Sequence, residues 1–92
     1  MPKGIPRERS VQKDLLRRYK IAQGHLGKVV KMLEGNHYCL DVVHQSIAVQ
    51  AALKKADRAL LENHLKTCVA DQIKKGQDQE SITEIMGVLR KI

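Results

Sequence analysis

Apolar residues recur at helical spacing along three stretches of this chain. In the first stretch, residues 10 to 34, they fall within a sector of about 80° at 100° per residue, which predicts an amphipathic helix. Ser10 stands where a helix N-cap is expected, and Gly35 and Asn36 are expected to stop this helix and to cap the next. The apolar face of the first helix consists of Val11, Leu15, Tyr19, Ala22, Leu26, Val29 and Leu33.

The second stretch is much longer. From Asn36 to Lys75 the chain contains neither Gly nor Pro and is rich in Ala, Leu, Lys, Gln and Glu. A continuous helix of about 35 to 38 residues would be roughly 55 Å long, nearly twice the diameter of a small domain. A compact subunit cannot bury both ends of such a rod, so its apolar positions are expected to meet other chains.

The third stretch follows the polar segment KKGQDQ. Ser81 and Glu84 in SITE have the spacing of a capping box, which predicts a short third helix. Residues 1 to 9 hold both prolines and several basic side chains, and we expect a flexible basic arm there. Residues 10 to 92 are expected to form a single all-α domain of three helices with a long second helix. The apolar positions of the third helix are Ile82, Ile85, Met86, Leu89 and Ile92.

Composition supports helices and suggests a polyanionic partner. The chain has 92 residues, no Phe or Trp and only two tyrosines, so its core must be aliphatic, which suits packed helices better than a β-sandwich. Its net charge of +7 favours nucleic acid or an anionic membrane as partner, although basic charge also serves solubility alone. Basic side chains occupy the polar side of the first helix and the middle of the second: Lys13, Arg17, Arg18, Lys20, Lys28, Lys31, Lys54, Lys55 and Arg58.

Several functional classes are disfavoured. No apolar run approaches the roughly 18 to 20 residues of a membrane span, and MPKGIPRERS lacks the apolar core of a signal peptide, so we expect a cytoplasmic protein. No short turn joins two compact helices as in a helix-turn-helix. No nucleophile, base and orienting group converge, so we expect neither an enzyme nor a small-molecule substrate. In the cytosol, two cysteines near histidines suggest metal or redox chemistry before a structural disulfide.

Cys39, His64 and Cys68 share one side of the predicted second helix. His64 and Cys68 lie four residues apart, and Cys39 is related to them by rotations of about 340° and 20°. Along the axis, however, Cys39 lies roughly 37 to 43 Å from the other two. A two-fold related antiparallel helix would bring the start of one rod beside the end of the other. The spacing therefore predicts two identical intersubunit sites, each with Cys39 from one chain and His64 and Cys68 from its partner.

The donor set favours one metal over others. Two thiolates and one imidazole form a soft three-coordinate site that suits Cu(I), whereas structural Zn(II) usually takes four protein ligands and square-planar Ni(II) needs a fourth donor. The alternative is a hydrogen-bonded histidine and a buried thiol without a metal. Among the other histidines, His25 is expected to be a hydrogen-bonded structural residue, His37 to be solvated, and His44 to lie outside the ligand set.

The segments LLRRYKIAQGHLGKVVKMLEGNHYCLDVV and ALLENHLKTCV, with Cys39, His64 and Cys68 in that order, resemble the copper-sensing branch of the CsoR/RcnR family of bacterial metal-responsive repressors. The resemblance covers about residues 11 to 90. It implies a three-helix subunit, an antiparallel helical dimer with intersubunit Cu(I) sites, and a dimer of dimers that binds operator DNA without a helix-turn-helix.

The resemblance also assigns residues. By position, Cys39, His64 and Cys68 are the implied Cu(I) ligands. Tyr38 and Glu84 match a pair near the metal that the family links to allosteric response, although Glu84 has the competing role of a capping-box residue. The basic positions that match those implicated in operator binding are Arg18 and Lys55.

The implied function is Cu(I)-responsive repression: the apo protein binds operator DNA and Cu(I) releases it, derepressing copper-efflux genes. Nickel- and cobalt-sensing relatives add a histidine near the N-terminus, where this chain has Arg7, and persulfide-sensing relatives lack the histidine that His64 supplies. A thiol-sensing or nickel-sensing repressor of the same family is the alternative. From another class, the alternative is a metal-handling helical protein that does not bind DNA.

Overall fold

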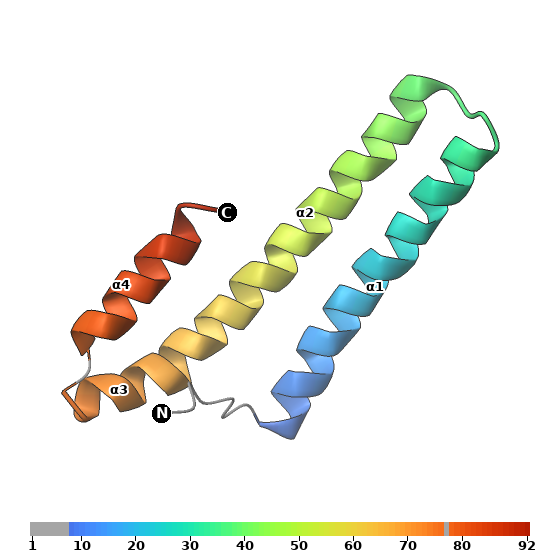
Figure 1. Ribbon diagram of the computed structural model, residues 1–92. Coiled ribbons are helices and arrows are strands. Elements are labelled where there is room, and N and C mark those ends of the chain that lie inside the picture. The colour runs from blue at the N-terminus through green and yellow to red at the C-terminus, as the bar shows by residue number, and fades with distance from the viewer. Residues whose placement is uncertain (1–7, 77) are drawn as a thin grey trace.

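The computed structural model describes residues 8–76 and 78–92, whose regular structure is entirely helical (Figure 1). α1 (Arg9–Glu34) and α2 (Cys39–His64) are long, a π-helical turn η1 (Leu65–Val69) and a short α3 (Ala70–Lys74) continue α2, and α4 (Asp78–Leu89) completes the chain. The continuous rod from α2 to α3 is the predicted long second helix, so the all-α, three-helix prediction is confirmed. Most of the predicted arm, residues 1–7, lies outside the described residues.

The turn between α1 and α2 corrects one predicted cap. Asn36 has φ of 55°, the left-handed conformation that ends a helix. The His37 N–H donates to the Met32 carbonyl at 3.0 Å and the Asn36 N–H to the Leu33 carbonyl at 3.2 Å, which is the Schellman arrangement. Asn36 therefore closes α1 instead of capping α2, whose first helical residue is Cys39, preceded by Tyr38 as N-cap.

Two other predicted helix starts are also wrong. α1 begins at Arg9, because the backbone of Glu8 is already extended and its carbonyl accepts the first helical bond from the Gln12 N–H at 2.9 Å. Ser10 is thus inside the helix. α4 begins at Asp78, three residues before Ser81, and Glu80 in its first turn suits the positive end of the helix dipole. The Ser81 and Glu84 pair is therefore not a capping box.

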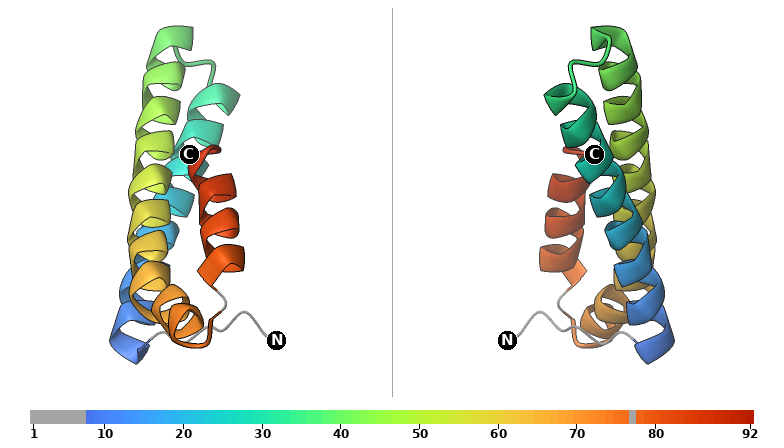
Figure 2. Two further views of the ribbon diagram at one scale, coloured as in Figure 1. Left: turned by 90° about the vertical axis from the view of Figure 1, so that its left-hand side faces the viewer. Right: turned by 90° about the vertical axis from the view of Figure 1, so that its right-hand side faces the viewer.

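α1 and α2 pack side by side as an antiparallel hairpin that holds the core (Figures 1 and 2). The best buried side chains are Leu15 and Ala22 on α1 and Val49 and Ala56 on α2, each at most 5% exposed. Small side chains such as these two alanines allow packed helices to approach closely. Four residues make a thin core, because two helices in contact can bury only one side of each.

The subunit leaves much apolar surface uncovered. Its Cα radius of gyration is 17.1 Å, against about 12 Å for a compact chain of this length, and its principal extents are 55 × 28 × 18 Å. On α2, Leu40, Val43 and Ile47 recur at helical spacing and remain 51–54% exposed. Leu26 and Leu33 of the predicted α1 face are also at least half exposed. The expected contacts between the rod and other chains would cover this surface.

The C-terminal helix is held less firmly than the hairpin. α4 makes most of its contacts with α3, and the rod bends where η1 joins α2 to α3 (Figure 2). Ile82, Met86 and Leu89 of α4 are 47–49% exposed. Among the described residues, no helix combines the length and the apolar character needed to cross a membrane.

Candidate metal centre

Cys39 is the first residue of α2 and carries an exposed free thiol. It follows the left-handed turn at Asn36, so the hairpin connection fixes its backbone close to the end of α1. Tyr38 caps the helix without a side-chain hydrogen bond to it and is 66% exposed. This end of the rod therefore presents a thiol and a phenol outward, with no partner from the opposite end of its own helix.

His64 ends α2 at the opposite end and is half-buried. Cys68 lies in η1, within the described backbone, but its side chain is outside the described set. Between them the helix changes from α to π bonding. The Thr67 hydroxyl donates to the Asn63 carbonyl at 2.8 Å, and such a back-bond from a β-branched residue competes with the regular helical bond.

The structure keeps the two ends apart. α2 runs 26 residues from Cys39 to His64, which corresponds to about 37 Å of helix. Within the described residues, no three His, Cys, Asp or Glu side chains come together as a metal site. Two thiolates and an imidazole suit Cu(I), but these donors fit one ion only if a second subunit supplies part of the set.

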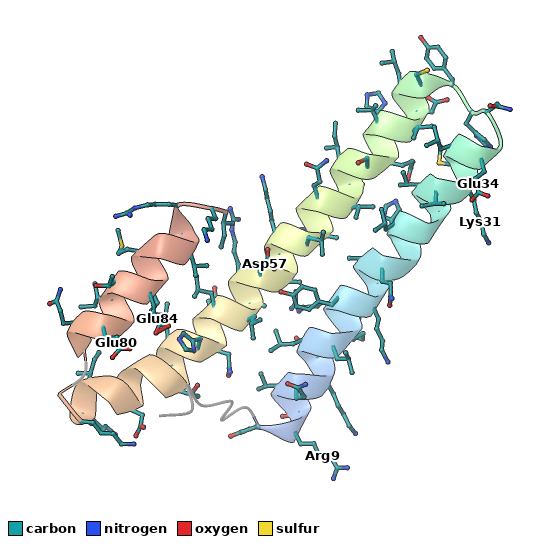
Figure 3. All side chains as sticks on the ribbon, in the orientation of Figure 1. Arg9, Lys31, Glu34, Asp57, Glu80 and Glu84 are labelled. Carbon is teal, nitrogen blue, oxygen red and sulfur yellow. The ribbon has the colours of Figure 1, made fainter. Side chains whose placement is uncertain are left out.

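Tyr38 and Glu84 also lie at opposite ends of one subunit. Glu84 is half-buried on α4, and Figure 3 shows it with Glu80 near the end of the rod that carries His64 and η1. Because α4 begins at Asp78, the capping-box role no longer competes with the role that the resemblance assigns to Glu84. Within one subunit, Tyr38 and Glu84 are therefore separated along the rod, as Cys39 and His64 are.

Of the remaining histidines, one is paired within the subunit and two lie on its surface. His25 on α1 forms a side-chain hydrogen bond with Gln45 on α2, with 2.8 Å between Nε2 and Oε1, which confirms its structural role. His37 and His44 are exposed.

The predicted DNA-contacting side chains lie on the surface of the hairpin. All are exposed except Arg18, which is half-buried. Arg18 and Arg17 both donate to the Asp14 carboxylate, at 3.0 and 3.3 Å, and these hydrogen bonds lower the pKa of Asp14. Part of the positive charge at this end of α1 is therefore balanced within the helix. The exposed members are Lys13, Arg17, Lys20, Lys28, Lys31, Lys54, Lys55 and Arg58.

Two features were missed by reasoning from the sequence. The π-turn η1 follows His64 and includes Cys68, and its local signal is the β-branched pair Thr67 and Val69 in one turn. The second feature is a 2.6 Å hydrogen bond from the Tyr19 hydroxyl to Asp57. These two residues are 38 positions apart, and only the packing of α1 on α2 brings them together.

A small all-α subunit that presents soft metal donors at both ends of one rod, and basic side chains along its surface, has the features of a helical metal-responsive DNA-binding protein. The chain belongs to the family of metal-sensitive transcriptional repressors, whose sequence pattern matches residues 11–91. The family consists of repressors, which agrees with the expectation that the chain is not an enzyme.

Named relatives give the same assignment. The chain is 41% identical over 75 residues to the copper-sensing transcriptional repressor CsoR of Mycobacterium ulcerans, covering 82% of this chain and 64% of that protein, so it spans less than two thirds of this relative. It is 38% identical over 90 residues to CsoR of Bacillus subtilis, covering 97% and 89%. The crystal structure of CsoR with Cu(I) from Geobacillus thermodenitrificans NG80-2 superimposes with a TM-score of 0.87 at 38% identity, over 96% and 92% of the two chains.

Proposed function

We propose that this protein is a Cu(I)-responsive transcriptional repressor that binds operator DNA in the apo form and is released from it by Cu(I). The observation that carries the proposal is the placement of a thiol at one end of a 26-residue helix and of an imidazole and a second thiol at and just beyond its other end. That donor set suits Cu(I), and a relative of the same fold was solved with Cu(I).

The proposed assembly is an antiparallel dimer through α2, two of which form a tetramer. In each site Cys39 comes from one subunit and His64 and Cys68 come from its partner. The exposed apolar positions Leu40, Val43 and Ile47 and the extended shape of the subunit support such an assembly, because a partner would bury them.

The proposed DNA-binding surface is the set of nine basic side chains on α1 and α2. Of these, Arg18 and Lys55 match the family positions that are implicated in operator binding. At +7 per chain, a tetramer has ample charge to replace counterions along a duplex. With only two tyrosines and neither Phe nor Trp, base stacking is expected to contribute little, so phosphate contacts and DNA shape are expected to dominate recognition. The proposed repressor acts in the cytoplasm, where operator DNA is found.

The coupling between Cu(I) binding and release from DNA depends on where the residues of this chain lie. Bound Cu(I) would supply a soft centre that holds two thiolates and an imidazole together. Cys39 lies on the hairpin, whereas Cys68 lies on the π-turn that leads to α3 and α4. Binding one ion to Cys39 of one subunit and Cys68 of its partner would therefore shift the C-terminal segment of the partner against the hairpin of the first subunit. Tyr38 and Glu84 would meet in the same way, across the dimer. Cu(I) lowers DNA affinity only as far as it binds the DNA-free conformation more tightly.

The test is a titration of labelled promoter DNA from the protein's own operon, with and without Cu(I), read by fluorescence anisotropy. Saturating Cu(I) is expected to weaken the apo complex by a factor of 100 or more, about 2.7 kcal/mol of coupling. X-ray absorption should report two sulfur ligands and one nitrogen ligand. Absence of apo binding, or DNA affinity unchanged by Cu(I), would refute the proposal.

The thiol-sensing alternative gives a different product. If Cys39 and Cys68 of neighbouring subunits respond to persulfide, mass spectrometry after persulfide treatment shows covalently linked dimers and DNA is released without copper. Under the copper proposal, release requires Cu(I) and the chains remain unlinked.

A further inference from the structure

Two side-chain hydrogen bonds between described residues join α1 to α2. The Tyr19 hydroxyl donates to Asp57 Oδ1 at 2.6 Å, and His25 is paired with Gln45 at 2.8 Å. On α2 the two acceptor positions are 12 residues apart, or about 18 Å, and differ by about 120° around the helix. The two bonds therefore join α1 to different faces of α2.

Asp57 shares a face of α2 with the proposed metal ligands. It lies 18 residues after Cys39, which is five full turns at 100° per residue, and seven residues before His64, within about 20° of the same direction. Figure 3 shows Asp57 on the stretch of α2 between the hairpin connection and the C-terminal segment. Of the two cross-helix hydrogen bonds between described residues, the Tyr19–Asp57 bond is therefore the one on the ligand-bearing face.

The hairpin is tightly packed at this level. Ala56 beside Asp57 is fully buried, and Tyr19 lies one turn from both Leu15 and Ala22, which are at most 5% exposed. Burial, followed by the hydrogen bond to Asp57, raises the pKa of Tyr19 to about 12, so its phenol remains a donor at neutral pH. Tyr19 and Asp57 are themselves half-buried beside these core residues, so a shift of Asp57 is passed to α1 through the bond.

α1 in turn carries most of the basic side chains proposed to contact DNA. Arg18 follows Tyr19 directly, but points about 100° away from it, so Tyr19 itself does not face the same surface. Tyr19 and Asp57 are therefore placed to position the basic side chains without touching DNA.

We propose that the Tyr19–Asp57 hydrogen bond is the link through which a shift of the ligand-bearing face of α2 is transmitted to the basic side chains of α1. This inference rests on the proposed function and names a positioning pair for its regulation. Breaking the bond should uncouple the two sites while leaving each of them able to bind.

The experiment compares Tyr19→Phe with Gln45→Met, each of which removes one of the two cross-helix bonds and preserves side-chain volume closely. For the full-length proteins, promoter DNA affinity is measured in the apo and Cu(I)-saturated forms, and Cu(I) affinity is measured without DNA. In Tyr19→Phe the Cu(I)-dependent loss of DNA affinity is expected to fall from at least about 100-fold to about tenfold. Its apo DNA affinity and its Cu(I) affinity should change by no more than about twofold. Gln45→Met should retain the wild-type coupling.

Asp57→Asn provides the rescue variant, because an amide oxygen still accepts the phenol hydrogen bond, whereas Asp57→Ala cannot. Asn should keep the coupling and Ala should lose it. The inference is overturned if Tyr19→Phe keeps the full Cu(I)-dependent loss of DNA affinity. It is also overturned if Gln45→Met loses as much of this coupling as Tyr19→Phe, because that would indicate general loosening of the hairpin. Failure of the wild type to bind DNA, or to respond to Cu(I), is a separate result that removes the proposed function itself.

A readout on the apo protein tests the bond directly. In a Tyr38→Phe background Tyr19 is the remaining tyrosine, so its ionisation can be followed by ultraviolet absorbance. The phenol should titrate near 12 with Asp57 present and at a lower pH in Asp57→Ala, where burial alone still raises its pKa. The same titration midpoint in both proteins would show that the bond is absent in solution and would overturn the inference.

Discussion

The α1–α2 hairpin and the C-terminal segment from η1 to α4 differ in how firmly they are held. The hairpin contains all the buried residues among the described side chains, and two side-chain hydrogen bonds cross it. In the segment from η1 to α4 no described side chain is buried, and the helical bonding changes to π between His64 and α3. For this difference in burial among the described side chains, the hairpin is called the frame and the segment from η1 to α4 the adjustable segment.

The proposed metal site takes donors from both regions. Cys39 belongs to the frame, Cys68 belongs to the adjustable segment, and His64 lies at their boundary. A site made only within the frame would bind without moving anything, because packed cores resist small displacements. A donor set that spans a firm and a loosely packed region can convert binding into movement.

The largest predicted effect tests whether the two regions meet between subunits. Cys39→Ala and Cys68→Ala should each lower Cu(I) affinity by more than about 100-fold, since loss of even an outer partner of a metal ligand costs 10- to 100-fold. In a heterodimer of the two variants, one site regains Cys39 from the second chain and Cys68 from the first. Isothermal titration should therefore recover one tight Cu(I) site per heterodimer.

The control is a heterodimer of Cys39→Ala with wild type, which should also keep one complete site. If the heterodimer of the two variants binds no copper tightly, the donors do not pair across subunits in the proposed way.

The next prediction compares the packing of the two regions with the same substitution. Leu15→Ala in the frame, at 5% exposure, should cost about 2 to 4 kcal/mol of unfolding free energy, because it leaves a cavity. Leu89→Ala in α4, at 49% exposure, should cost less than about 1 kcal/mol. Urea unfolding of the apo proteins at one protein concentration measures both. Equal costs would show that α4 is as firmly packed as the hairpin.

Much of this division follows from sequence pattern. Helical periodicity predicted the hairpin helix at residues 10 to 34 and the long rod, because burial of one apolar face decides where such helices lie. The ends were less accurate. In the sequence, Asn36 is equally suited to be an N-cap or a left-handed residue at a helix C-terminus. Its positive φ and the backbone hydrogen bonds of the turn show that it ends α1.

Other features depend on contacts that no local pattern encodes. The Tyr19–Asp57 bond needs the register of two packed helices, and the π-turn depends on competition between the Thr67 hydroxyl and the backbone for one carbonyl. The candidate ligands were predicted from their types and spacing, and the structure confirms only that Cys39 and His64 cannot meet within one subunit. Their joint role as a metal site remains a prediction.

The third prediction concerns the pH dependence of the frame. The pKa of Tyr19 is raised from 10.0 to about 12, so the folded state favours the protonated phenol. Its contribution is fully present below pH 10 and is lost as the pH rises through 12. The stability difference between wild type and Tyr19→Phe should therefore be about 1 to 2 kcal/mol at pH 9 and should shrink toward zero near pH 12. Urea unfolding of both proteins across this range measures it, because other titrating groups cancel in the difference. A constant difference would contradict the assignment.

The smallest predicted effect concerns the boundary between the two regions. Thr67→Val keeps the branched shape but removes the hydroxyl that donates to the Asn63 carbonyl, a bond whose net value is about 1 kcal/mol. If that bond supports the π-turn that carries Cys68, Cu(I) affinity should fall by about fivefold while apo DNA affinity stays unchanged. Thr83→Val on α4 is the matched control, because the Thr83 hydroxyl makes the same back-bond, to the Gln79 carbonyl at 3.0 Å, in a regular α-helix. Competition against a Cu(I) chelator compares the two variants, and equal Cu(I) affinities for them would show that the π-turn does not depend on Thr67.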